Sequence, residues 1–232
     1  MSYKTELHCH TCEASGCADE SAAETVEKYI KYGYTTVVLT NHFSNVDSDR
    51  GVADPYTDMI DRHLLALRLA REAAGDRLNV LWGIELRLDE SNNDYLVFGA
   101  DEELLRNNRD LLGRDIWGAH SFLNDHGAIV IHAHPMRTGT KITHPDSVDG
   151  YEVYNGHNEQ NSRNEMAFAW GAYARTVKRS SIFTSGSDKH DRHHIPDAGI
   201  ETEEPIVTMD QLVRTLESGD YKLIRSDLAG RE

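Results

Sequence analysis

The sequence contains few cysteines, no long apolar run and little basic charge, and each shortage excludes a class of protein. Its three cysteines, Cys9, Cys12 and Cys17, are an odd number crowded near the start, which is not a disulfide framework. No apolar run reaches the length of a membrane span, and the opening MSYKTELHCH lacks the apolar region of a secretory signal. We therefore expect a cytoplasmic protein in which Cys9 is a small apolar side chain within a strand.

Basic residues are outnumbered, because 24 Lys and Arg face 39 Asp and Glu, for a net charge of −15. This charge argues against a protein that coats nucleic acid or a membrane, since both surfaces are negative. Bound cations would neutralise part of the acidity. The chain has 232 residues, of which 39% are hydrophobic, so residues 1–232 are predicted to form a single domain around one core.

Strand-like and helix-like segments alternate along most of the chain. Short runs of β-branched and aromatic residues predict strands at 5–9, 36–41, 79–86, 95–99, 129–134, 151–154 and 182–187. Helical patterns lie between Ser21 and Gly33 and at 58–74, 101–112, 115–126, 162–178 and 209–218, and Ser21 with Glu24 and Thr208 with Gln211 form capping boxes. The alternation predicts an α/β fold of parallel strands with helical crossovers, either a barrel or a doubly wound sheet.

Histidines and carboxylates gather where the predicted strands end. The residues concerned are His8 and His10, Asn41 and His42, Glu85, His132 and His134, and Asp188 and His190. In a βα-barrel the carboxyl ends of the strands face one mouth, so residues that are distant in sequence converge there. Six histidines beside two carboxylates exceed the needs of one acid–base pair, and these ligands suit zinc, manganese or iron. The pattern predicts a metal centre.

A histidine can also have an ordinary structural role, and this alternative applies to each candidate. A single histidine at a strand end is more often hydrogen-bonded within the fold than bound to metal, and we interpret His63, His120, His126 and His144 in that way. His193 and His194 lie in the polar segment DRHHIPD, which we interpret as a solvated loop, with contact to substrate as the alternative. The case for metal depends on several strand ends that carry ligands together.

Six motifs in chain order give the sequence a family resemblance. They are HCHT near the start, LTNH at 39–42, GIEL at 83–86, AHPMR at 133–137, EVYN at 152–155 and SGSDKH at 185–190. Together they resemble the PHP family, named for polymerase and histidinol phosphatase. The resemblance implies a distorted (β/α)7 TIM-like barrel with a trinuclear metal site that hydrolyses phosphate esters.

The resemblance also implies how two or three divalent ions, Zn, Mn or Fe, would be shared. His8 and His10 would hold a first ion with Glu85 and Asp188, and Glu85 would bridge to a second ion on His134. His42 and His190 would hold the third.

Two positions depart from the family pattern. Where the family commonly has a histidine before the strand that follows the Glu motif, this chain has Asp94, which is predicted to ligate the second ion. After HCHT, where a histidine or aspartate often serves the third ion, the candidates are Glu13 and Asp19, with Asp19 preferred.

A phosphoesterase of this kind would use a metal-bridging hydroxide to attack phosphorus in line, since bridging cations lower the pKa of water. Arg137, Arg163 and Arg192 are the candidates to hold phosphate oxygens, with a solvated charge as the alternative for Arg163. Protonation of the leaving alcohol would fall to Asp188 or to His157, and the sequence does not choose between them.

Three functions stay open at this point. The first is hydrolysis of a small phosphomonoester, such as histidinol phosphate or a nucleotide. The second is metal-dependent hydrolysis of another bond, such as C–N. The third is a metal-binding regulatory protein with a decayed site. A polymeric nucleic-acid substrate is not expected, because the chain is acidic and has no evident basic cluster.

Overall fold

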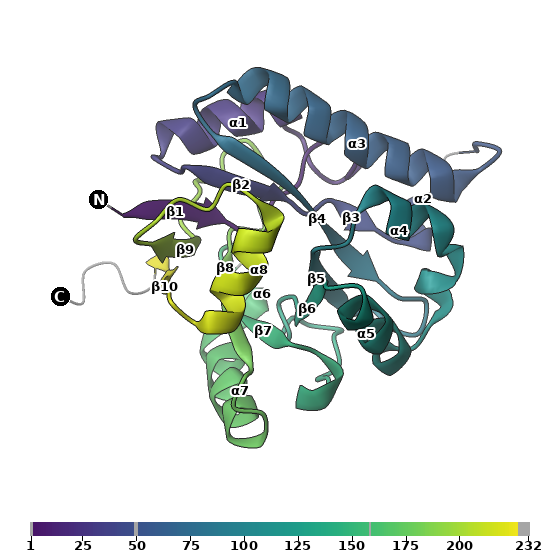
Figure 1. Cartoon of the computed structure of the whole chain (residues 1–232), viewed down its shortest axis with the longest axis vertical. Helices are drawn as coiled ribbons and strands as arrows, with labels where there is room; N and C mark the ends of the chain where they lie inside the picture. The colour runs from purple at the N-terminus through teal and green to yellow at the C-terminus, as the bar shows by residue number, and fades with distance from the viewer. Residues whose placement is uncertain (1, 49–50, 158, 227–232) are drawn as a thin grey trace.

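The protein is built on one sheet that curls into a barrel, as a computed structural model describes for residues 2–48, 51–157 and 159–226 (Figure 1). Its strands are β1 (Tyr3–Glu6), β2 (Thr36–Leu39), β3 (His42–Phe43), β4 (Asn79–Arg87), β5 (Asp94–Phe98), β6 (Ile129–His132), β7 (Gly150–Asn155), β8 (Ile182–Gly186), β9 (Gly199–Thr202) and β10 (Lys222–Ile224). They follow the order β10-β9-β1-β2-β4-β5-β6-β7-β8, and β3 pairs with β4. All seven predicted strands are present within a few residues of their expected bounds.

The segments just beyond β1 and β8 bring the two sides of the sheet together. Cys9 and Lys189 form an isolated parallel bridge. The Asp188 N–H donates to the His8 carbonyl over 2.8 Å, and the His10 N–H donates to the Lys189 carbonyl over 3.2 Å. The predicted distorted barrel is thereby confirmed, and three of the residues at its closure, His8, His10 and Asp188, are among those expected to ligate metal.

The prediction of parallel strands with helical crossovers over most of the chain is wrong at β5, and the strands β9 and β10, which were not predicted, are antiparallel as well. β5 runs antiparallel to both β4 and β6, and β9 runs antiparallel to β1. The connection between β4 and β5 spans only residues 88–93, which is too short for a helical crossover, so the chain turns back as a hairpin.

The helices lie outside the barrel or across its end, and both predicted capping boxes are formed. They are α1 (Ala22–Lys31), α2 (Asn45–Ser48), α3 (Pro55–Ala74), α4 (Glu102–Asn107), α5 (Ile116–Asp125), α6 (Glu159–Ser162), α7 (Asn164–Val177) and α8 (Met209–Ser218), with 3₁₀ turns η1 (Arg109–Gly113) and η2 (Pro145–Ser147). The helix predicted at 162–178 begins at Asn164, because Arg163 before it has a left-handed φ of 52°, and the helix predicted at 101–112 is divided into α4 and η1. Among the described residues, no helix combines the length and apolar character that crossing a membrane requires.

Three apolar clusters hold these layers together. One joins α1 and α3 to the strands beneath them, and a second joins α3, α4, α5 and α7 to the same face of the sheet farther along it. The third contains Val38, Leu96 and Ile131 from the strands together with Leu212 and Leu216 of α8. Because α8 contributes buried leucines to a cluster shared by many strands, it fixes the barrel at one end and leaves the other end to polar residues.

Candidate metal centre

Seven of the predicted ligands converge where strands of the barrel end. They are His8 and His10 after β1, His42 in β3, Glu85 in β4, His134 after β6, and Asp188 and His190 after β8. Their possible ligand atoms form three overlapping groups, which are His8 with Glu85 and His134, His8 with His10 and Asp188, and His10 with His42 and His190. Residues from five segments of the chain therefore meet at one place, as the strand-end argument predicted.

His8, Glu85, His134 and Asp188 form a half of the centre that is rich in carboxylates, and we call these four residues the carboxylate half. His8 Nε2 lies 3.1 Å from Glu85 Oε1 and 3.3 Å from Asp188 Oδ1. His134 Nε2 lies 3.0 Å from the same Glu85 oxygen. All four side chains are at most 2% exposed, so this half is shielded from solvent.

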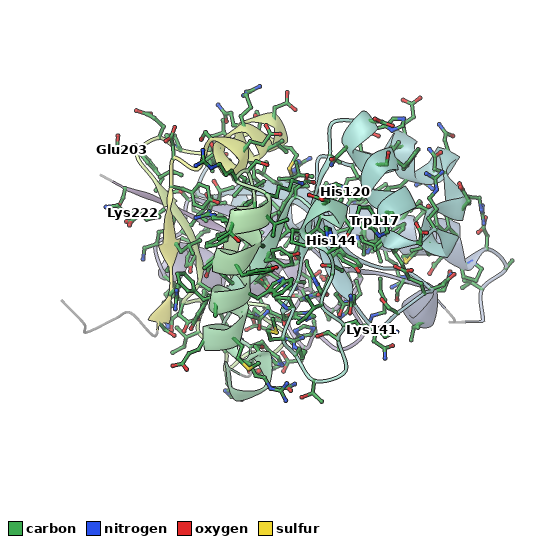
Figure 2. The ribbon with its side chains drawn as sticks, turned by 90° about the horizontal axis from the view of Figure 1, so that it is seen from below. Trp117, His120, Lys141, His144, Glu203 and Lys222 are labelled. Carbon is green, nitrogen blue, oxygen red and sulfur yellow. The ribbon has the colours of Figure 1, made fainter. Side chains whose placement is uncertain are left out.

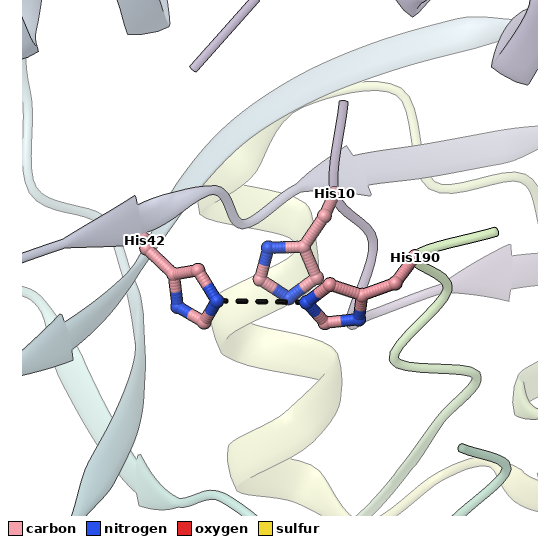
Figure 3. A group of neighbouring side chains, drawn as sticks. All are labelled: His10, His42 and His190. Atoms are coloured by element: carbon pink, nitrogen blue, oxygen red, sulfur yellow. Dashed lines mark hydrogen bonds between the residues drawn. The ribbon is translucent and has the colours of Figure 1, made fainter. Parts of the chain in front are cut away.

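The third group, His10, His42 and His190, forms the histidine half (Figure 3). The rings of His10 and His190 are stacked with centroids 4.1 Å apart, and the Nε2 atoms of His42 and His190 are 3.5 Å apart. Glu85 connects the two halves, because its Oε2 is 2.6 Å from His42 Nδ1 and 3.4 Å from His10 Nε2.

Several buried polar atoms in the centre lie close to one another but make no well-formed hydrogen bond among the described residues. They are Nε2 of His8 and of His10, Oε2 of Glu85 and Oδ1 of Asp188. Buried polar groups in native proteins are nearly always satisfied, so an inward-facing set of imidazole nitrogens and carboxylate oxygens needs another partner. This donor set fits divalent cations such as Zn, Mn or Fe.

The local charges set the protonation of these residues. Burial opposes a charge on His8, but Asp188, Glu152 and Glu85 raise its pKa well above the usual value. Burial would raise the pKa values of Glu85 and Asp188, yet His8 and the neighbouring histidines hold both well below the usual range. Both carboxylates are therefore ionised, which is the form that ligates metal.

Two of the converging residues have left-handed backbones. His134 has a φ of 30° and Asp188 a φ of 50°, and Arg163 is the third such non-glycine residue in the part of the chain that the structure describes. Backbone strain of this kind costs about 1–3 kcal/mol and is concentrated at functional sites. At His134 the left-handed backbone also ends the alternation of side chains along the strand, so His132 and His134 do not share a site. His132 instead hydrogen-bonds Thr143 over 2.8 Å and belongs to none of the three groups.

Glu152 of β7 supports the centre and was not singled out as a site residue. Its Oε1 is 2.9 Å from His8 Nδ1, and its Oε2 accepts from the His134 N–H over 2.8 Å and from Asn155 Nδ2 over 2.9 Å. The buried carboxylate thus orients His8 through its Nδ1 and His134 through its backbone N–H, as outer partners of metal-binding histidines do. The EVYN motif contained the signal, since a glutamate between apolar strand residues is costly to bury without partners.

Cys17 is a second residue that the sequence argument did not place here. Desolvation would raise the pKa of its thiol, but hydrogen bonds with His190 and His42 outweigh this and lower the pKa to about 6. The thiol is exposed and belongs to none of the three groups of converging atoms, and its lowered pKa brings it close to thiolate, the form that binds metal, at neutral pH. The odd number of cysteines in this segment was the available signal.

The three predicted ligands at the variable positions lie farther from the centre. Asp94 binds Arg87 with its Oδ1 2.6 Å from Nε, and its Oδ2 is 3.7 Å from His134 Nε2. Glu13 accepts the Ala22 N–H over 3.0 Å at the start of α1. Asp19 faces Arg192 over 3.3 Å, with nearly half of its side chain exposed. Their roles as ligands stay predictions, and Asp94 is nearest to the centre.

The predicted phosphate-binding arginines differ in position. Arg137 reaches the centre, where its Nη2 lies 2.6 Å from Asp188 Oδ2 and 3.1 Å from Asn155 Oδ1. Arg163 is exposed and faces Thr138 over 3.3 Å, and Arg192 is paired with Asp19. His157 places its ring centroid 5.2 Å from that of His190. Of the arginines, only Arg137 touches the converging residues.

The remaining histidines have structural partners. His63 is buried with Nε2 3.0 Å from the His42 carbonyl, and His120 Nε2 is 3.1 Å from Asp149 Oδ1. His144 stacks near Trp117 with ring centroids 5.6 Å apart, and Figure 2 shows these two with His120 on one side of the molecule. These contacts agree with the ordinary structural interpretation.

The fold matches solved structures, although no protein-family model and no curated protein matches the chain. A two-domain protein from Bacteroides vulgatus ATCC 8482, described as containing a predicted PHP-like metal-dependent phosphoesterase, aligns with a TM-score of 0.68 and 16% identity over 97% of this chain. PsfC from Pseudomonas syringae PB-5123 aligns with a TM-score of 0.65 and 16% identity over 99% of this chain and 94% of its own.

A third match is Endonuclease Q, solved with a 27-mer duplex that has an abasic lesion at the active site. It aligns with a TM-score of 0.66 and 13% identity over 96% of this chain. The present chain spans 65% of the Bacteroides protein and 58% of Endonuclease Q. The resemblance read from the motifs is therefore confirmed at the level of the fold.

Proposed function

We propose, from the premise that this chain shares the fold of PHP-type phosphoesterases, that it belongs to that family and is a metal-dependent hydrolase of a small phosphate ester. We further propose that residues 1–232 act as one domain and that the protein works in the cytoplasm, where its three free cysteines stay reduced. The single observation that supports hydrolysis best is the set of buried, unsatisfied nitrogen and oxygen atoms directed at one another from five chain segments.

Two or three divalent ions fit the donor set. The carboxylate half would hold ions through His8, Glu85, His134 and Asp188, and the histidine half through His10, His42 and His190 with Cys17 as a further ligand. When bound, such ions supply Lewis-acid charge and a water acidic enough to react near neutral pH. Glu85, which contacts both halves, is suited to bridge them.

The protein side chains hold the substrate and fix the ligands. Arg137 presents its guanidinium beside Asp188, where it would grip an anionic phosphate oxygen. Glu152 keeps His8 and His134 oriented. Neither candidate general acid carries a proton near neutral pH, since His8 and its neighbours lower the pKa of Asp188 against the effect of burial, and burial lowers that of His157. We therefore assign Asp188 to metal binding, and protonation of the leaving alcohol to water.

A nucleic-acid substrate is the second candidate, because Endonuclease Q shares the fold and was solved on a lesion-containing duplex. The net charge of −15 opposes it, since a DNA backbone requires a compensating basic surface. A small phosphomonoester makes no such demand, so we place it first.

The test combines elemental analysis of the purified protein with hydrolysis of a generic aryl phosphate before and after chelation. We expect bound Zn, Mn or Fe, activity that chelation abolishes, and a loss of more than about 100-fold in Asp188→Ala, since even outer-sphere changes at metal sites cost 10–100-fold. Asp146→Ala, which removes an exposed carboxylate facing only His144, is the matched control and should keep full activity.

Two results would contradict the proposal. One is a correctly folded protein that binds no metal. The other is an Asp188→Ala variant that hydrolyses the aryl phosphate as well as the control. Cleavage of an abasic duplex together with inactivity on every phosphomonoester would favour the second candidate.

A further inference from the structure

Three side chains outside the two halves of the centre also converge near its edge. His157, Asp191 and His194 each place one possible ligand atom within 4.8 Å of the others. His157 follows β7, whereas Asp191 and His194 belong to the turn after β8. Two neighbouring strand ends thus supply two imidazole nitrogens and one carboxylate oxygen at a single place.

Asp191 is held in position by the turn that carries it. Its Oδ1 accepts the N–H groups of His193 over 2.8 Å and of His194 over 2.9 Å. No donor among the described residues is hydrogen-bonded to its Oδ2, which is therefore available to a ligand. A ligating carboxylate that is itself hydrogen-bonded is the usual arrangement at metal sites.

His157 is anchored on the facing strand end. Its N–H donates to Asn155 Oδ1 over 3.1 Å, and its carbonyl accepts from the Ser162 hydroxyl over 2.9 Å. Its ring is stacked with that of His194, with centroids 6.0 Å apart and planes inclined by 28°. The two imidazoles are thus held in neighbouring, nearly parallel orientations from separate segments.

A further carboxylate lies near His194. Asp197 Oδ1 is 4.0 Å from His194 Nε2, which is too far for a hydrogen bond, so Asp197 adds a carboxylate beside the group and does not fix the ring.

We propose that His157, Asp191 and His194 bind a further divalent ion at the rim of the barrel mouth, of the borderline class that includes zinc and cobalt. Three protein ligands leave at least one position open to solvent or to an anionic oxygen. All three residues are partly exposed, so this ion exchanges more readily than ions bound by the buried groups. A role in holding substrate rests on the proposed function, whereas metal binding itself does not.

The experiment counts zinc ions per chain by native mass spectrometry after saturation with Zn²⁺. Four full-length proteins are compared: the unaltered chain, His194→Ala, Asp191→Asn and His193→Ala. His193→Ala is the matched control, because it removes an exposed imidazole in the same turn and keeps the backbone N–H to Asp191. We expect His194→Ala and Asp191→Asn to bind one zinc ion fewer than the unaltered chain and the control.

Equal zinc counts in all four proteins would overturn the proposal. Asp191→Asn guards against misfolding, since the amide oxygen can accept the same two N–H groups and preserve the turn. Visible absorption of the Co²⁺-loaded proteins gives a second readout, in which a d–d band is lost only from the two site variants. Neither measurement requires turnover, so failure of the hydrolase proposal would leave the metal count unaffected.

Discussion

His8 and His10 both follow the end of β1 and are both 0% exposed. Their neighbours nevertheless shift the pKa values of the two imidazoles in opposite directions. Burial lowers the pKa of each, but Asp188, Glu152 and Glu85 reverse the effect at His8 and raise its pKa well above the usual value. At His10, burial acts together with His190 and His42 to lower the pKa well below that value. Two identical residues therefore acquire different charge states from their partners and not from their depth.

The same contrast separates the two halves of the metal centre. Two carboxylates offset positive charge in the carboxylate half. In the histidine half, Glu85 and Cys17 are the negative partners of His42, and the pKa of His190 is raised to about 10 because hydrogen bonds with Asp188 and Cys17 outweigh burial. A metal ion that enters this half must displace protons from His42 and His190, so its binding should strengthen as pH rises.

The largest effect is expected from Glu85→Gln, which removes the charge that the two halves share. We predict a loss of activity of more than about 100-fold and a lower metal content in both halves, because Glu85 contacts ligands in each. Elemental analysis and aryl phosphate hydrolysis measure this, with the exposed Glu165→Gln as control. Full metal content in Glu85→Gln would show that the halves do not depend on a common carboxylate.

The next largest effect is expected from Lys189→Met, which removes the partner of Glu20 in the segment that carries Cys17. Lys189 is 0% exposed and pairs with the buried Glu20, whose carbonyl accepts the Cys12 N–H over 2.8 Å. Lys189→Met should destabilise the fold by about 3–5 kcal/mol, since it leaves a buried carboxylate with less compensation. Urea unfolding measures the change. The Glu20→Gln/Lys189→Met double variant should lose less than the sum of the single variants, and simple additivity would contradict the pairing.

A smaller and more selective effect is expected from Cys17→Ala. Removal of the thiol should weaken metal binding in the histidine half by about 10-fold and leave the carboxylate half unchanged. Titration against a competing chelator measures each binding step. Cys12→Ala, an exposed cysteine of the same segment, serves as the control, and identical titrations for the two variants would remove Cys17 from the centre.

The smallest effect concerns a buried histidine outside both halves. Burial lowers the pKa of His63 to about 4 from an ordinary 6.5, so between these values the unfolded chain binds more protons than the folded one. Stability should therefore fall as pH drops from 6.5 to 4. The His63→Gln variant can still donate to the His42 carbonyl. Its free energy of unfolding should depend less steeply on pH than that of the unaltered chain, when both are measured in the presence of a chelator.

Urea unfolding across this pH range provides the measurement for His63. The exposed His126→Gln is the control. An unchanged slope in His63→Gln would show that His63 is not the residue that titrates.

The sequence could predict the converging ligands because strand ends of a barrel share one mouth whatever their spacing in the chain. It could not predict that β5 reverses, since an antiparallel hairpin and a parallel crossover use similar apolar runs. The positive φ of His134 is a consequence of tertiary packing. On a regular strand the H-x-H spacing would put His132 and His134 on one face, and this backbone conformation separates them.

Glu152 and Cys17 were missed for different physical reasons. Glu152 lies within β7 and acts through the far side of His8, so its role depends on register across the sheet. Cys17 lies in an irregular segment between β1 and α1, where no periodicity indicates the direction of a side chain. In both cases the contact is made between segments that only the folded barrel brings together.

The closure of the barrel by His8, His10, Asp188 and Lys189 has a consequence for biosynthesis. His8 is synthesised and emerges from the ribosome long before Asp188 is added to the chain. Contacts between such distant positions form only after a large loss of chain entropy. The emerging chain therefore carries an incomplete set of ligands until its last third has been translated. On the proposed function, tight metal binding would therefore follow synthesis of the last third of the chain and would not accompany it.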